Sequence, residues 1–73
     1  MSGRLNIDDA NEEYQLHLPK DGWDTVGGLV MDLAGGVPEI GQVLVTEGYR
    51  LTVERMEGRR VEEVFVEPIA RAE

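Results

Sequence analysis

Residues 24–41 read DTVGGLVMDLAGGVPEIG, a helix pattern enclosed by two glycine pairs. Four aliphatic residues in this stretch recur at i, i+3, i+4 and i+7, the spacing that places side chains on one face of a helix. These residues are Val26, Leu29, Val30 and Leu33. The stretch therefore predicts an amphipathic helix over Val26–Ala34 that Asp24 or Thr25 caps. Gly35-Gly36 and Pro38 end it, because glycine accepts left-handed geometry and proline cannot continue a helix.

Gly27 and Gly28 lie in the first turns of this helix, where each costs about 1 kcal/mol relative to alanine. Two explanations of that cost are open. The helix start approaches a sheet or another backbone closely, or it holds an anion or ligand. Asp24 puts a negative charge where an anion would sit, which favours the close approach. We therefore expect an architectural role for the motif residues, which are Asp24, Thr25, Gly27, Gly28, Gly36, Pro38 and Gly41.

The chain before this helix predicts a short strand, a short helix and a connection. Residues 4–7 alternate polar and apolar side chains, which is the pattern of a strand. Asp8 or Asp9 then caps a helix that ends near Tyr14, because a carboxylate accepts hydrogen bonds from the free amides of a first turn. In the connection that follows, Trp23 covers the core beside the next helix or, alternatively, stacks on a ligand ring.

The rest of the chain predicts three strands, at residues 42–46, 49–56 and 59–67. The pair Glu57-Gly58 predicts a two-residue hairpin turn, which places Leu51 opposite Val64. One face of the hairpin is then the floor of the core, with Tyr49, Leu51, Val53, Val64 and Val66. The other face carries an apolar patch that is a candidate contact surface, made of Met56, Val61 and Phe65. Cross-strand ion pairs are expected to join Glu54, Glu62 and Glu63 to Arg55, Arg59 and Arg60.

The predicted fold class is α+β, a small antiparallel sheet with two short helices packed on it, in a single domain over residues 1–73. The formal net charge of -8 argues against binding to nucleic acid or to an anionic membrane surface. The chain has no cysteine for a disulfide or a thiolate metal site. It also has no run of about 20 apolar residues, so this segment does not insert directly into a membrane.

The sequence holds no catalytic constellation, so we expect a protein that is not an enzyme. Ser2 is the only serine, and no cysteine is present. His17 is the only histidine, and it has no sequence neighbour that would make it a catalytic base. The glycines form neither a GxGxxG element nor a phosphate-binding GxxxxGK loop. The sequence alone therefore predicts no nucleotide site.

Four carboxylates near the start of the chain are the candidate metal ligands, namely Asp8, Asp9, Glu12 and Glu13. They form two i, i+4 pairs, and oxygen ligands at such spacing suit Ca²⁺ or Mg²⁺ with several waters. The cluster lacks the loop spacing of a dedicated calcium site. Helix capping and solvated charge are the alternative explanation.

With these residues laid out, the chain resembles the CorC/HlyC-type transporter-associated domain. This is the C-terminal domain of bacterial magnesium and cobalt efflux proteins, hemolysin-like proteins and some cation/proton antiporters. The resemblance extends from about Gly3 to Pro68. The matching residues are Gly3-Arg4-Leu5, Ile7-Asp8-Asp9, Asn11, Asp24-Thr25-Val26-Gly27-Gly28-Leu29-Val30, Gly36-Val37-Pro38, Ile40-Gly41 and Gly58-Arg59-Arg60.

The resemblance implies a fold similar to FAD-binding (PCMH-like) domains, and FAD binding follows from that kinship only. It implies a module without catalytic residues that modulates ion transport on the cytoplasmic side of the bacterial inner membrane. Its partners would be the CBS domains and the membrane domain of the same parent protein, with a homodimer as an alternative. Relatives often have a further strand before Gly3. We therefore expect an excised C-terminal fragment whose missing edge a neighbouring copy replaces.

Overall fold

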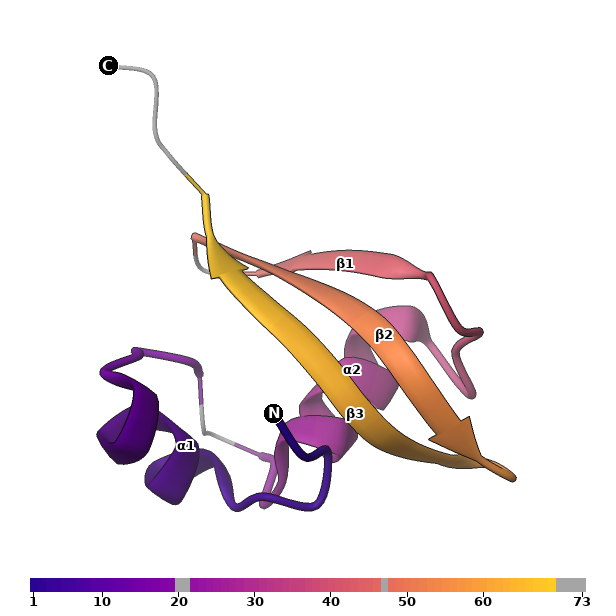
Figure 1. The fold of residues 1–73 in the computed structure, drawn as a ribbon, viewed down its shortest axis with the longest axis horizontal. Helices are drawn as coiled ribbons and strands as arrows, with labels where there is room; N and C mark the ends of the chain where they lie inside the picture. The colour runs from indigo at the N-terminus through magenta and orange to yellow at the C-terminus, as the bar shows by residue number, and fades with distance from the viewer. Residues whose placement is uncertain (20–21, 47, 70–73) are drawn as a thin grey trace.

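The chain folds as one antiparallel sheet with a helix across one face, as seen in the computed structural model of residues 1–19, 22–46 and 48–69 (Figure 1). The sheet has three strands in the order β1-β2-β3. The elements in chain order are α1 (Ile7–Tyr14), α2 (Val26–Ala34), β1 (Val43–Thr46), β2 (Tyr49–Glu57) and β3 (Arg60–Pro68). The sheet is covered by α2, and α1 lies to one side (Figure 1). The predicted α+β class is confirmed.

The helix α2 has the predicted bounds, because its sequence carries both its caps and its apolar face. Thr25 is the N-cap, and its side chain accepts a hydrogen bond from the Gly28 N–H at 3.1 Å. Gly35 ends the helix in the left-handed conformation, with φ of 76°. The apolar stripe packs as predicted, since Val26, Leu29 and Val30 are all buried. Of the two predicted caps, Thr25 takes the role and Asp24 does not.

The prediction of a strand over residues 4–7 is wrong, because α1 begins at Ile7. Its N-cap is Asn6, whose side chain accepts from the Asp8 N–H at 2.8 Å. Asp8 and Asp9 therefore lie in the first turn instead of capping it, a place where carboxylates interact favourably with the helix dipole. Ile7 and Ala10 are buried, and their spacing of three is the helical period. Within residues 4–7 only Asn6 forms a β-bridge, with Thr25, while Ser2 forms another with Glu63.

The N-terminal segment, residues 1–6, lies between the start of α2 and β3. Gly3 donates its N–H to the Glu62 carbonyl at 2.9 Å, and its own carbonyl accepts from the Gly27 N–H at 2.7 Å. A Cβ added to Gly27 would lie 2.8 Å from the Gly3 carbonyl oxygen, too close for real atoms. A Cβ on Gly3 would overlap the Val61 carbonyl oxygen. The sequence analysis expects the start of this helix to approach another backbone closely, and the structure confirms this for Gly27.

The hairpin between β2 and β3 turns one residue later than predicted. Glu57 pairs with Arg60, so the two loop residues are Gly58 and Arg59. Gly58 has φ of 62° while Arg59 does not have positive φ, which is the pattern of a type II′ turn with glycine first. The predicted pairing of Leu51 with Val64 is therefore wrong. Leu51 lies opposite Val66, and Val53 lies opposite Val64.

Two compensating irregularities in this hairpin also change which side chains enter the core. The register shifts between Val53 and Arg55 and again between Arg55 and Met56. As a result Val61 and Val64, three positions apart, are both 1% exposed and share the core. The predicted contact patch is therefore wrong in two of its three members. Val61 is buried and Met56 packs against the core, so only Phe65 stays exposed, at 51%.

The core joins both helices to the inner face of the sheet. It contains Ile7, Ala10, Leu18, Val26, Leu29, Val30, Leu44, Leu51, Val53, Val61 and Val64. Trp23 is half-buried and packs against this cluster, as the sequence predicts. Neither helix has the length and apolarity that crossing a membrane requires, within the described part of the chain.

Replacing Gly27 by alanine tests the close approach. Gly27→Ala is expected to lower the free energy of unfolding by about 1–3 kcal/mol, because its Cβ must displace the main chain at Gly3. Gly28→Ala is the matched control, since its Cβ would meet only the Thr25 Oγ1 at 3.3 Å. The better helix propensity of alanine offsets that contact. Urea unfolding followed by circular dichroism measures both variants, and equal losses would contradict the role of Gly27.

Candidate functional site

A cavity of about 280 Å³ lies at the start of α2, where the sequence places its glycine motif. Thr25, Gly27 and Gly28 line it from the helix, and Arg4 lines it from the N-terminal segment. Arg60 and Val61 line it from β3. The other motif residues do not line this cavity. Gly36 and Gly41 have positive φ in the turns after α2, and Pro38 is buried there.

The backbone amides at the start of α2 already have hydrogen-bond partners. The Val26 N–H donates to the Leu5 carbonyl at 2.9 Å, and the Gly27 N–H donates to Gly3. The Gly28 N–H donates to the Thr25 side chain. An anion at a helix N-terminus is held by free amides of the first turn. Phosphate recognition by this turn is therefore not supported, and the glycines act here as architecture.

Arg4 makes the ion pair with Glu62 that the sequence assigns to other arginines, and it also reaches Glu57. Its Nε lies 3.3 Å from the Glu62 carboxylate, and its guanidinium reaches Glu57 at 3.9 Å. Arg50 pairs with Glu67 across the strands at 3.5 Å. Within residues 48–69, no ion pair joins Arg55, Arg59 or Arg60 to a carboxylate, so that prediction is wrong. The physical reason is that the N-terminal segment lies antiparallel beside β3, through the bridge between Ser2 and Glu63, and brings Arg4 to Glu62.

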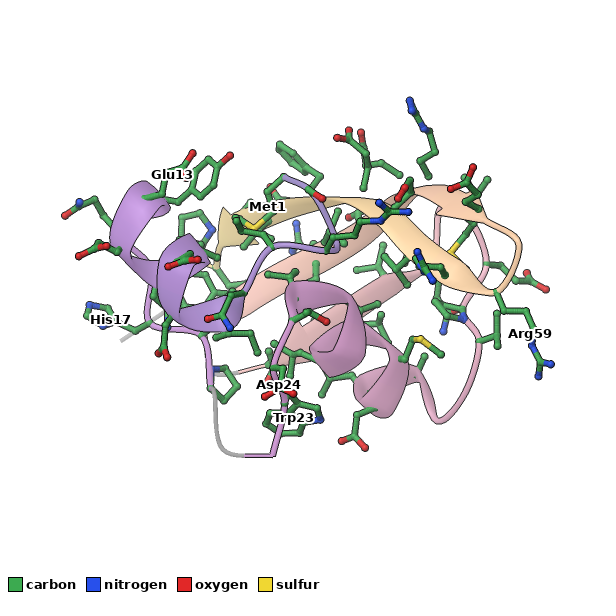
Figure 2. All side chains as sticks on the ribbon, turned by 90° about the horizontal axis from the view of Figure 1, so that it is seen from below. Met1, Glu13, His17, Trp23, Asp24 and Arg59 are labelled. Carbon is green, nitrogen blue, oxygen red and sulfur yellow. The ribbon has the colours of Figure 1, made fainter. Side chains whose placement is uncertain are left out.

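The four predicted metal ligands lie on α1, and all four are exposed. Asp8 and Glu12 line one open hollow together with the exposed His17, whereas Asp9 and Glu13 do not line it. Figure 2 shows Glu13 and His17 pointing away from each other. Within the described ranges, no three His, Cys, Asp or Glu side chains gather so as to hold a metal ion. The arrangement fits only a hydrated cation on one or two carboxylates.

Asn11 is a structural residue whose role the sequence pattern does not reveal. Its side-chain oxygen accepts from the Leu18 N–H at 2.8 Å, and its side-chain nitrogen donates to the Leu18 carbonyl at 3.1 Å. The Tyr49 hydroxyl accepts from the His17 N–H at 2.9 Å. These three bonds fasten the connection after α1 to the helix and to β2. A ligand-stacking role for Trp23, which lies beside Asp24 in Figure 2, stays a prediction.

Comparison with known proteins identifies the family. The sequence profile of the transporter associated domain family, CorC_HlyC, matches residues 1–70. The magnesium and cobalt efflux protein CorC of Escherichia coli K12 is 36% identical over 61 residues, which are 84% of this chain and 21% of that protein. The chain thus spans about a fifth of the length of the curated relatives that it matches.

Two solved structures share the fold. The transporter associated domain from a CBS domain protein of Porphyromonas gingivalis has a TM-score of 0.84 and 25% identity, covering 96% of this chain and 86% of that one. The CorC_HlyC domain of a Xylella fastidiosa hemolysin, in complex with Mg²⁺ and Mn²⁺, has a TM-score of 0.80 and 18% identity. That match covers 96% of this chain and 85% of the other.

The fold and the profile define a small α+β domain of the transporter-associated class. This chain belongs to the CorC_HlyC transporter associated domain family. The predicted family is confirmed. The comparison with PCMH-like FAD-binding domains stays a prediction.

Trp23 reports whether the start of α2 binds a phosphorylated ligand. We expect no saturable change in its fluorescence when FAD, ATP or inorganic phosphate is added to about 1 mM, because the first-turn amides are occupied. The readings are corrected for absorption by the ligand with free tryptophan as the control. A saturable change with any of the three ligands would contradict this expectation.

Proposed function

We propose that this chain is a non-catalytic regulatory domain of a cation-transport or hemolysin-like protein. The observation that carries the proposal is the match of the family profile to residues 1–70. The chain is the single C-terminal domain of a longer parent in this proposal. It lies on the cytoplasmic side of the inner membrane and modulates transport by packing on CBS domains or by self-association.

The distribution of side chains supports a role in contact more than one in chemistry. The glycine motif is used to pack α2 on the N-terminal segment. Several large apolar side chains are exposed instead of buried, and exposed apolar patches mark interaction sites. They are Tyr14, Val37, Ile40, Val43, Val45 and Phe65. The relatives supply the rest of the support, since one is named an efflux protein and another a CBS domain protein.

Deleting the matching domain from a full-length relative such as Escherichia coli CorC tests this role. We expect magnesium and cobalt efflux to persist but to lose its normal dependence on cation concentration, because the domain biases the transporter without forming its path. A chimera that carries residues 1–73 of this chain is expected to restore the dependence, and the same chimera with Gly27→Val is the misfolded control. Efflux with unchanged regulation after the deletion would refute the proposal.

Binding of a hydrated divalent cation is the second candidate function. The Mg²⁺ and Mn²⁺ complex of the Xylella fastidiosa hemolysin domain is the observation that favours it. In this chain Asp8 and Glu12 would hold the ion, with water completing its shell. Asp9 and Glu13 do not line this hollow and would contribute only long-range attraction.

Calorimetry separates the two carboxylate pairs. Mg²⁺ and Mn²⁺ are expected to bind weakly, with Kd of about 1 mM or above, because two carboxylates and water make a low-affinity site. Asp8→Asn with Glu12→Gln is expected to abolish the heat of binding. Asp9→Asn with Glu13→Gln removes the same charge from the same helix and is expected to retain it. Equal loss in both double variants would show general charge attraction instead of a site.

A further inference from the structure

The strand β1 has an open side in the described part of the chain. It pairs with β2 through Val43–Thr46, and no described strand pairs with its other side (Figure 1). Proteins protect such edges with charges, prolines or bulges. Residues 42–46, QVLVT, contain no charge and no proline, and the pairing of β1 with β2 has no register shift. Within β1 itself, this edge therefore has no charge, proline or bulge, and its short length of four residues is the one protective device that it carries.

The hydrogen-bond pattern shows which groups face the open side. The Val53 N–H donates to the Gln42 carbonyl at 2.9 Å, and the Val53 carbonyl accepts from the Gly41 N–H at 2.7 Å, so Val53 is a hydrogen-bonded position of the ladder that Gly41 and Gln42 oppose together. Such positions alternate along the ladder, so Leu44 and Leu51 form the next hydrogen-bonded pair. The N–H and C=O groups of Val43 and Val45 consequently point to the open side of β1.

The side chains of the same two residues lie on the outer face of the sheet. Val43 is 51% exposed and Val45 is 61% exposed, although both are aliphatic. Val43 pairs with Thr52, and Thr52 pairs with Phe65, so the exposed apolar side chains of Val43 and Phe65 flank the half-buried Thr52 on this face. The edge thus offers both main-chain bonds and apolar contacts to one partner.

We propose that β1 pairs antiparallel with β1 of a second copy of this chain, about a two-fold axis at Leu44. Val43 then lies opposite Val45 of the second copy, and Val45 opposite its Val43. In these two pairs, the outward N–H and C=O groups of Val43 and Val45 in both copies form four main-chain hydrogen bonds between the copies. If the register between the two copies shifted by one residue, the outward N–H and C=O groups of one copy would lie opposite groups of the other copy that already bond to β2. The result is a continuous six-stranded sheet.

Charge favours this contact over others between two copies. Each copy carries a formal net charge of -8, so copies repel one another wherever carboxylates approach. Residues 42–46 carry no charge. The acidic helix α1 lies on the far side of the molecule from β1 (Figure 1). Pairing through β1 therefore brings together the neutral edges and keeps the acidic helices apart.

The size of the contact sets its strength. A pair of four-residue strands buries less than the roughly 1,200 Å² of a stable interface, so the isolated chain dimerises weakly, with Kd of about 100 µM or above. Two copies held in one larger assembly would pair more readily, because their effective concentration reaches about 1 mM. This inference deepens the proposed self-association and rests on that proposed function.

Sedimentation equilibrium of the 73-residue chain between about 10 µM and about 2 mM tests the pairing. The average mass is expected to rise from 8.1 kDa toward twice that value, and added salt is expected to promote the rise by screening repulsion. In parallel, amide hydrogen exchange at Val43 and Val45 is expected to slow as concentration rises. A monomer throughout, or exchange at these amides that is independent of concentration, would overturn the inference.

Two lysine variants identify the surface. Val45→Lys is expected to leave a monomer even though it lowers the net negative charge, because it puts a charge at the paired edge. Val37→Lys is the matched control, since Val37 is 45% exposed and lies outside β1, and it is expected to dimerise like the unchanged chain. Dimerisation of Val45→Lys, or an equal loss of dimerisation in both variants, would exclude β1 as the contact surface. A chain that stays monomeric would refute the β1 pairing but would not change the outcome of the deletion experiment on the full-length relative. The failure of this inference and the failure of the proposed function can therefore be told apart.

Discussion

The hydrogen bond from the Gly27 N–H to the Gly3 carbonyl is the contact on which the rest of the structure depends. At 2.7 Å, it draws the start of α2 against the N-terminal segment, and the Gly3 N–H ties that segment to β3. The start of α2, the N-terminal segment and β3 meet at Gly3 and Gly27, and neither position has room for a Cβ. The two glycines are 24 residues apart in the numbering (27 − 3), so their contact closes the fold across most of its N-terminal half.

This packing also explains why the glycine-rich helix start offers little chemistry. The same contacts that bring Gly27 against Gly3 occupy the amides that would otherwise hold an anion. They also hold Arg4 beside β3 near the Glu62 carboxylate, where it makes the ion pair expected of the hairpin arginines. The features that remain exposed are the acidic helix α1 and the neutral apolar edge β1. These exposed surfaces support the proposed role in contact for this member of a transporter-associated family.

Local signals predict α2 and the existence of the three strands well. The bounds of α2 follow from Thr25 and Gly35, whose capping interactions involve residues within four positions along the chain. The same reasoning fails over residues 4–7, where alternation resembles a strand but the Asn6 cap begins a helix at Ile7. The candidate metal site stays a prediction, and the structure divides its four carboxylates into two pairs. Four carboxylates adjacent in sequence separate in the fold, since Asp8 and Glu12 line the hollow beside His17 and the other two do not.

The sequence alone establishes the helix α2, the strands, the acidic charge and the lack of cysteine, because these depend on composition and on neighbours along the chain. Tertiary structure establishes that Gly27 has no room for a side chain while Gly28 has some, and that Val61 enters the core instead of an outer patch. Those outcomes depend on contacts between segments distant in sequence and on two compensating shifts in one hairpin. The periodicity of the sequence does not reveal contacts between distant segments.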